Sequence, residues 1–401
     1  MNLLLGRSRI FSPQASSLIA AENSVPVTEP SKSINLIGLD RRSLEEFFVE
    51  LGERAYRAPQ LMKWIYHKGV EDFRAMTDFS KDLRMRLDAV ATLEMPVELS
   101  RDESSDGTVR WVMQTQNGNA IETVWIPDGG RNTLCISSQI GCMLDCSFCA
   151  TGKQGFNGNL LTSEFIGQVL HADRVLKKDW DPRGITNVVF MGMGEPLLNF
   201  DAVMGSVDVL KDDFGFGLSK RRITISTAGV VPGIKKMCGR TDVALAISLH
   251  SPRDLVRSEL VPINRKYPIA NLIKVCGEYL STLGERRSVT IEYTLMEGVN
   301  DSPEDARDLA QLLRGLKCKI NLIPFNPFPS SGYSRPSSGA IEVFQNDLIN
   351  SGYTTMLRKT RGEDIDAACG QLVGQVQDRT RRSERHASRD ETVGPTLNHL
   401  S

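Results

Sequence analysis

Residues 133–153 read TLCISSQIGCMLDCSFCATGK and place three cysteines, Cys142, Cys146 and Cys149, within eight residues. Three thiols this close cannot all pair with one another as disulfides, but they can converge on one metal site. A structural zinc site normally takes four protein ligands, and no fourth cysteine or histidine lies nearby in the sequence. An iron–sulfur cluster held by three cysteines instead of four keeps one iron open for a substrate or cofactor. The spacing therefore favours a catalytic iron–sulfur site.

From residue 133 onward, segments that predict strands alternate with segments that predict helices. Short β-branched runs predict the strands, and they are TLCIS (133–137), NVVFMG (187–192), RRITIST (221–227), VALAISLH (243–250), VTIEYTLM (289–296), KINLIPF (319–325) and YTTMLRK (353–359). Five longer runs between them carry apolar residues with a period of 3.6, which is typical of amphipathic helices, and they are residues 163–178, 201–212, 270–284, 303–316 and 339–352. Strands joined by helices run parallel, and this many in a row favour a barrel. We predict an α/β fold with a partial (β/α)6-type barrel over residues 128–370.

The rest of the chain divides into shorter regions. Apolar residues three or four apart, as in SLEEFFVELG and APQLMKWIYHKG, predict a small helical domain over residues 35–95. Alternating segments around the turn signal Asn117-Gly118 predict a β-hairpin linker over residues 96–132. Residues 1–34 and 377–401 have little to bury, and the second stretch is rich in arginine. We expect a disordered extension and a disordered basic tail there.

Composition limits the class of protein. The 401 residues are 40% hydrophobic and 24% charged, enough for a full globular core, which excludes disorder throughout. The net charge of -1 gives no whole-chain signature of a nucleic-acid binder. No apolar run approaches the about 18 residues of a membrane helix, so we expect no membrane contact. Clustered cysteines in a chain this long fit a reducing compartment, and we expect a cytoplasmic monomer.

The Cys-x3-Cys-x2-Cys spacing after the first strand of a βα barrel resembles the signature of the radical-SAM superfamily. The resemblance implies a [4Fe–4S] cluster on Cys142, Cys146 and Cys149, whose open iron binds S-adenosylmethionine (SAM). In that superfamily an electron passed to SAM yields a 5′-deoxyadenosyl radical, while the protein orients the cofactors and excludes water. It also implies an external electron donor.

Glycine or polar residues follow four of the predicted strands. Ligands of parallel α/β sheets gather at the carboxyl ends of strands, so we expect these residues to line one mouth of the barrel and to bind SAM. The glycines of the GMGE run would let backbone approach the ligand closely. The predicted SAM-binding positions are Gly194, Glu195, Ser226, Ser248, Leu249, His250 and Asn326.

Longer runs resemble the RlmN family of RNA (adenine-C2) methyltransferases over roughly residues 35–375. The matching runs include IETVWIPDGGRNTLCISSQIGC, MGMGEPLLNF, STAGVVPGI, LAISLHSP, IPFNPFP and TRGEDIDAACGQL. The resemblance implies methylation of carbon 2 of adenine, in the peptidyl-transferase loop of 23S rRNA and beside the tRNA anticodon. It also implies that the helical domain contacts RNA.

The resemblance gives roles to three further residues. Cys369 matches the family's methyl carrier, which is loaded by one SAM while a second supplies the radical, so that two SAM are used per turnover. Cys135 matches the thiol that releases the RNA by forming a disulfide with the carrier, which then requires an external thiol reductant. Glu122 matches the proton acceptor. Without the resemblance, Cys369 would be taken for a buried apolar residue and Glu122 for a solvated strand residue.

Two other functions remain open. A Cfr-type enzyme, which methylates carbon 8 of adenine in rRNA, shares most of these motifs. We favour carbon 2 because the run LDRRSLEEFFVELGERAYRAPQLMKWIYHKG resembles the RlmN N-terminal domain. The alternative from another class is a non-catalytic zinc RNA-binding protein, which would hold neither iron nor sulfide.

Overall fold

The computed structural model describes residues 33–328, 331–374 and 378–382 of the chain. Residues 1–32 of the predicted extension 1–34 and most of the predicted tail 377–401 therefore lie outside the described residues. No helix in the described ranges is long and apolar enough to cross a membrane.

Seven parallel strands form the centre of the molecule, and all seven segments predicted as strands are confirmed. In sheet order they are β6 (Arg131–Cys135), β9 (Asn187–Phe190), β10 (Ile223–Thr227), β11 (Ala244–Ser248), β12 (Val289–Leu295), β13 (Cys318–Pro324) and β14 (Thr355–Leu357). Every neighbouring pair in this series is parallel. The sheet stays open, with β14 as one edge, so the partial barrel is confirmed.

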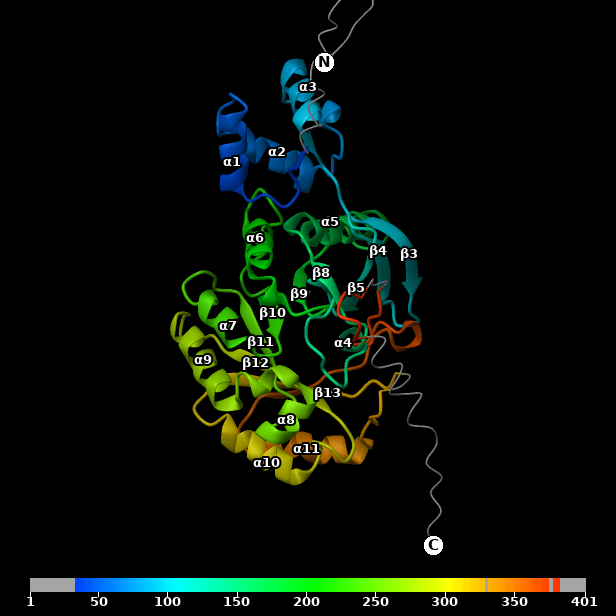
Figure 1. Ribbon diagram of the computed structural model, residues 1–401, viewed down its shortest axis with the longest axis vertical. Helices are drawn as coiled ribbons and strands as arrows, with labels where there is room; N and C mark the ends of the chain where they lie inside the picture. The colour runs from blue at the N-terminus through cyan, green and yellow to red at the C-terminus, as the bar shows by residue number, and fades with distance from the viewer. Residues whose placement is uncertain (1–32, 329–330, 375–377, 383–401) are drawn as a thin grey trace, which may run out of the picture.

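Helices cover the outside of this sheet (Figure 1). The five helices expected from a 3.6 period are α5 (Thr162–Asp179), α6 (Phe200–Lys211), α9 (Ile269–Ser281), α10 (Pro303–Leu312) and α11 (Ser338–Asn350). Their apolar faces are buried with the strands in one core, as Phe165 of α5 is against Phe190 of β9. Two further helices, α7 (Val231–Met237) and α8 (Asp254–Leu260), span only seven residues each, too few to show a clear period in the sequence.

The predicted hairpin is part of a larger antiparallel extension. Strands β4 (Val109–Gln114) and β5 (Ala120–Asp128) pair as expected, but β3 (Val97–Glu103) adds a third strand. Strand β5 also pairs with β6, so the extension continues the main sheet instead of linking two separate units. Most residues of β3 are exposed, which explains why no apolar alternation marked it.

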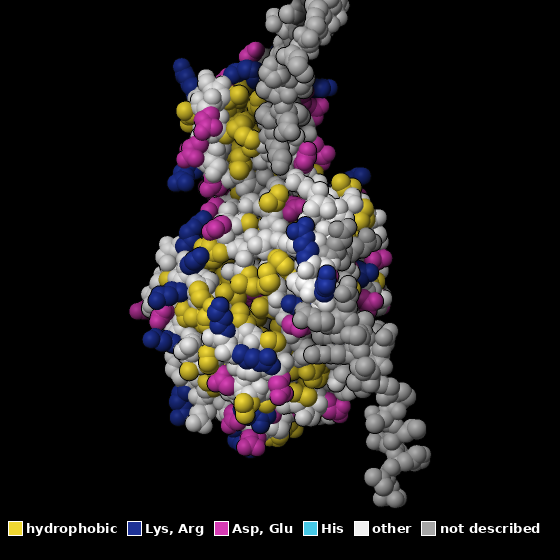
Figure 2. Space-filling view, in the orientation of Figure 1, with side chains coloured by type: hydrophobic (Ala, Val, Ile, Leu, Met, Phe, Trp, Pro, Cys, Tyr) yellow, Lys and Arg dark blue, Asp and Glu magenta, His cyan; other side chains and the backbone are white. Residues whose placement is uncertain are grey.

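The N-terminal helices form a unit at one end of the molecule (Figure 1). They are α1 (Arg41–Glu50), α2 (Arg57–Met62) with a following π-turn, and α3 (Lys81–Val90). A salt bridge from Arg41 to Asp212 and a contact between the rings of Tyr66 and Phe216 join this unit to the loop after α6. Positive and negative side chains are interspersed over both parts on the face shown in Figure 2, in line with the net charge of -1.

Candidate active site

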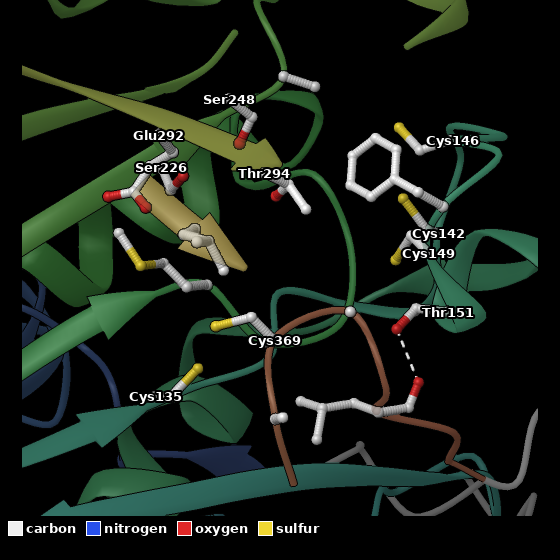
Figure 3. A pocket seen from close by; sticks show the side chains of 18 of the residues that line it. Cys135, Cys142, Cys146, Cys149, Thr151, Ser226, Ser248, Glu292, Thr294 and Cys369 are labelled. Atoms are coloured by element: carbon white, nitrogen blue, oxygen red, sulfur yellow. Dashed lines mark hydrogen bonds between the residues drawn. The ribbon is translucent and has the colours of Figure 1, made fainter. Parts of the chain in front are cut away.

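A cavity opens at the carboxyl ends of the parallel strands, and it gathers most of the predicted site residues (Figure 3). The predicted residues on its wall are Cys135, Cys142, Cys146, Cys149, Gly194, Glu195, Ser226, Ser248, His250, Asn326 and Cys369. Parallel strands end at the same edge of a sheet, so residues from distant parts of the chain meet there.

The three clustered cysteines lie in the loop between β7 (Gln139–Gly141) and α4 (Ala150–Lys153), on one side of the cavity. Removal from water and repulsion between neighbouring thiolates raise the pKa of Cys142 and of Cys146. Within the described ranges, no three His, Cys, Asp or Glu side chains lie close enough together to hold a single metal ion. The three thiols face the same space, however, and this donor set fits an iron–sulfur cluster with one open iron.

Glu195 is buried at the end of β9, and its carboxylate is held by backbone donors. Oε1 accepts from the N–H of Leu197 at 3.0 Å and Oε2 from the N–H of Ala228 at 2.7 Å. Burial raises the pKa of Glu195 to about 7, although both N–H groups oppose that shift. The side chain could receive a cationic amino group from the cavity.

The two glycines before Glu195 line the cavity and also lie against other residues of the chain. A Cβ on Gly192 would lie 2.8 Å from the carbonyl of Ile136, and one on Gly194 would lie 2.4 Å from Cβ of Gln139. Gly194 also has a φ of +95°, which disfavours other residues. The close approach that these glycines allow in the structure is therefore to residues 136–139 of the chain itself.

Residues from β10 and β11 complete this side of the cavity. Ser226 and Ser248 both point toward it (Figure 3). Nδ1 of His250 accepts from the N–H of Thr294 at 3.0 Å, which leaves the ring proton on Nε2. Burial, assisted by the charge of Arg257, lowers the pKa of His250 to about 3, so the ring is neutral. Leu249 is fully buried and is not among the residues on the cavity wall.

Cys135 and Cys369 lie near each other, away from the clustered cysteines (Figure 3). Cys135 is the last residue of β6, and both cysteines are free thiols. Burial and the neighbouring Cys369 raise the pKa of Cys135 to about 12. Cys369 belongs to a loop whose next residue, Gly370, accepts a hydrogen bond from the N–H of Ala150 in α4 at 2.8 Å. Asn326 approaches the same region, with Oδ1 3.2 Å from Oγ1 of Thr360.

Glu122 lies on β5 with only 3% of its surface exposed, but it is not among the residues on the cavity wall. It sits behind the segment that follows Cys369, where Oε2 accepts from the N–H of Val373. Burial raises the pKa of Glu122, while the charge of Arg110, 3.5 Å away, and the Val373 N–H oppose the rise. The sequence alone suggested that Glu122 is a solvated strand residue, and this interpretation is wrong.

Two charged residues on the cavity wall were not predicted. Glu292 on β12 accepts from Asn321 at 2.9 Å and has a pKa raised by burial. Arg358 follows β14 and interacts electrostatically with Cys369, Glu292 and Cys135. A glutamate inside the apolar run VTIEYTLM and an arginine at a strand end were the signals that could have revealed them.

The prediction of a disordered tail from residue 377 does not hold for residues 378–382. Arg382 is buried against the loop of clustered cysteines. The arginine-rich composition of the tail predicted solvated charges. It could not reveal the burial of Arg382, because the carbonyl oxygens that accept its hydrogen bonds belong to residues about 240 positions earlier.

Two family models match the chain. The Ribosomal RNA large subunit methyltransferase N-terminal domain matches residues 34–93, and the Radical SAM superfamily matches residues 136–312. The first match contains the helices α1 to α3, and the second begins directly after β6 and contains the three clustered cysteines.

Relatives match over almost the whole chain. The Dual-specificity RNA methyltransferase RlmN of Pseudomonas fluorescens (strain SBW25) is 56% identical over 362 residues, which cover 90% of this chain and 95% of the relative. The protein of the same name from Pseudomonas putida (strain W619) is 55% identical over 365 residues, with the same coverage. Among solved structures, a radical SAM methyltransferase from Sphaerobacter thermophilus is 42% identical, covers 84% of this chain and 99% of its own, and has a TM-score of 0.80. The chain belongs to the RlmN family of radical-SAM methyltransferases.

Proposed function

We propose that this protein methylates carbon 2 of adenine in 23S rRNA and tRNA. The observation that carries the proposal is one cavity lined both by the three clustered cysteines and by the pair Cys135 and Cys369. Carbon 2 of adenine is not nucleophilic and cannot take a methyl group from SAM by displacement. A carrier thiol beside a radical-generating site provides another route, and this cavity contains residues for both.

Cys142, Cys146 and Cys149 would hold a [4Fe–4S] cluster through three of its irons. Glu195, Ser226, Ser248, His250 and Asn326 would bind SAM, with the backbone at Gly194 beside them. The buried carboxylate of Glu195 suits the amino group of SAM, and the neutral Nε2–H of His250 can donate a hydrogen bond. When bound, the cluster and SAM supply an electron and a carbon radical, while the buried wall of the cavity excludes water.

The other two cysteines of the cavity, Cys135 and Cys369, carry and release the methyl group. The Cys369 thiolate accepts a methyl group by displacement, and the thioether formed is the carbon source for adenine. The carbon radical supplied by the bound cofactors would take a hydrogen atom from this methyl group, whose carbon then bonds to carbon 2 of adenine and joins Cys369 to the RNA. Loss of one electron, which the cluster would take back, and of the carbon 2 proton, which Glu122 accepts, restores the aromatic ring. Cys135 attacks the sulfur of Cys369 and a disulfide forms, while the bond from sulfur to carbon breaks and the carbon keeps the electron pair and takes up a proton to become the methyl group. An external thiol reductant restores both thiols, which is consistent with a cytoplasmic protein.

RNA has to present one base to the cavity, so unpaired or splayed-out loops are the expected targets. The N-terminal helical unit and the basic run at residues 219–222 would contact phosphates. The chain has no net positive charge that would attract RNA, so we infer that recognition depends on local contacts and on the shape of the RNA loop.

The test is anaerobic reconstitution followed by reaction with SAM, reductant and unmodified 23S rRNA or tRNA. Mass spectrometry of the digested nucleosides should show 2-methyladenosine, which should be absent with Cys142→Ala and Cys369→Ala. Detection of 8-methyladenosine instead would assign the protein to carbon 8. A protein that binds zinc and RNA but acquires no iron or sulfide would reject the enzymatic proposal.

A further inference from the structure

Arg382 is placed against the loop that carries the clustered cysteines. Only 8% of its surface is exposed. Its Nη1 lies within hydrogen-bond distance of three carbonyl oxygens, those of Cys142 at 3.0 Å, Leu144 at 2.7 Å and Gly152 at 2.9 Å. Its Nη2 donates to the carbonyl of Met143 at 3.0 Å. One side chain thus contacts four backbone carbonyls of the cysteine loop and of helix α4.

Arg382 reduces the electrostatic repulsion among these four carbonyl oxygens. Four carbonyl oxygens aimed at one point repel one another, and buried carbonyls without donors are costly. An arginine guanidinium is planar, permanently charged and carries five N–H donors, so one group can serve several acceptors. The carboxylate of Asp145, 3.7 Å from Nε, adds a weak ion pair on the outer side.

Between its first two cysteines the loop has two longer hydrogen bonds, from the N–H of Met143 to Oε1 of Gln139 at 3.3 Å and from the N–H of Leu144 to Sγ of Cys142 at 3.4 Å. Its ends are tied by Cys142 N–H to the carbonyl of Gly155 at 2.8 Å and by Ser147 N–H to the carbonyl of Leu260 at 3.1 Å. Residues 143 and 144 contribute carbonyls to Arg382, in the stretch that joins the first two cysteines. The conformation of that stretch sets where Cys142 and Cys146 point.

We infer that Arg382 is a positioning residue for the cluster site: it fixes the Cys142–Cys146 loop and places one positive charge beside it. The inference rests on the proposed function of the three cysteines as cluster ligands. Outer-shell partners of metal ligands typically contribute about 10- to 100-fold to metal retention. A fixed positive charge near a cluster also favours the reduced, more negative state, because charge is among the factors that set its potential.

The segment around Arg382 is also anchored without its guanidinium. The N–H of Phe156 donates to Oδ1 of Asp378 at 3.2 Å, and the N–H of Arg379 donates to the carbonyl of Phe156 at 3.1 Å. A substitution at residue 382 therefore leaves independent contacts that dock the segment. The side chain of Arg379 is exposed, which makes Arg379→Gln a matched control for loss of a nearby positive charge.

The experiment compares full-length wild-type protein, Arg382→Gln, Arg382→Lys and Arg379→Gln after anaerobic reconstitution. Three quantities are measured: iron and sulfide per chain, the rate of iron release to a chelator, and the midpoint potential of the cluster followed by electron paramagnetic resonance. We expect Arg382→Gln to release iron about 10-fold faster or more and to have a lower midpoint potential. Arg382→Lys should keep the potential near the wild-type value but restore iron retention only in part, since an ammonium cannot span four carbonyls. Arg379→Gln should match the wild type.

Different outcomes reject different statements. Wild-type protein that acquires no cluster would reject the proposed function itself. A wild-type cluster with the same iron release and potential in Arg382→Gln would reject only the role of Arg382. If Arg382→Gln and Arg382→Lys lose iron equally and neither potential changes, Arg382 merely holds the chain together and the inference is wrong.

Discussion

Oε2 of Glu122 accepts a hydrogen bond from the backbone N–H of Val373, with 3.1 Å between the two atoms. Val373 lies four residues after Cys369, so strand β5 is tied directly to the segment that carries the proposed methyl carrier. The same segment is tied to α4 by the N–H of Ala150, which donates to the carbonyl of Gly370 at 2.8 Å. Protonation of Glu122 would therefore affect the position of the Cys369 segment, and movement of that segment would affect the protonation of Glu122.

The pH dependence of methylation should report Glu122. A proton acceptor must be ionised, and burial raises the pKa of Glu122, so activity should fall on acidification at a higher pH than an ordinary glutamate would give. Arg110 opposes this rise, and Arg110→Gln should therefore move the acid limb to still higher pH. Single-turnover rates across a pH series check both shifts. If the acid limb is unchanged in Arg110→Gln, Glu122 is not the proton acceptor.

Substitution of Cys135 and substitution of Cys369 should stop the reaction at different stages. Cys369→Ala should abolish methylation without formation of any protein–RNA adduct, because no carrier sulfur remains. Cys135→Ala should accumulate the covalent adduct, because no second thiol can attack the sulfur of Cys369. Denaturing gel electrophoresis of reactions with labelled RNA distinguishes these results. Cys276→Ala, at a buried helical position outside the cavity, is the control and should form product without an adduct.

Gly194 should be intolerant of even one additional carbon. Gly194→Ala combines a positive φ with a Cβ 2.4 Å from that of Gln139, so we expect a loss of about 2–4 kcal/mol in the free energy of unfolding. Gly217 has a φ of +61° but nothing within 4 Å of an added Cβ, and Gly217→Ala should lose only about 1 kcal/mol. Urea unfolding of both variants measures the difference. Equal losses would show that the backbone moves away from Gly194 without cost.

His250 should make stability depend on pH. Its pKa is lowered to about 3 in the folded protein, so its contribution is present above the unfolded value of 6.5 and is lost as the pH falls toward 3. Between pH 7.5 and pH 5, this group alone should lower the free energy of unfolding by about 2 kcal/mol. His250→Asn should lose that much less over the same interval. Urea unfolding at the two pH values measures these changes. Equal losses in the free energy of unfolding for the wild type and His250→Asn would contradict the prediction.

The sequence was most informative where a local pattern determines a local structure. The runs from TLCIS to KINLIPF became strands because most of their apolar residues are buried, and that burial makes them apolar along most of their length. In the seventh run, YTTMLRK, the strand residues Met356 and Leu357 are exposed at the edge of the sheet. The five long helices were predicted for the same kind of reason. Strand β3 and helices α7 and α8 were missed because short or exposed elements bury too few residues to leave a period.

For the site, the sequence determined which residues have the required chemistry. The three cysteines and the strand-end residues could be predicted, because parallel strands bring their carboxyl ends to one edge whatever lies between them. The tertiary structure alone showed that Leu249 faces the core, that Glu292 and Arg358 join the wall, and that Glu122 lies behind the Cys369 segment. It also placed Arg382 on the carbonyls of the cysteine loop. The physical reason is that burial and hydrogen bonding depend on contacts between residues far apart in the chain, 251 positions for Glu122 and Val373 and 240 for Arg382 and Cys142, and no local pattern records these contacts.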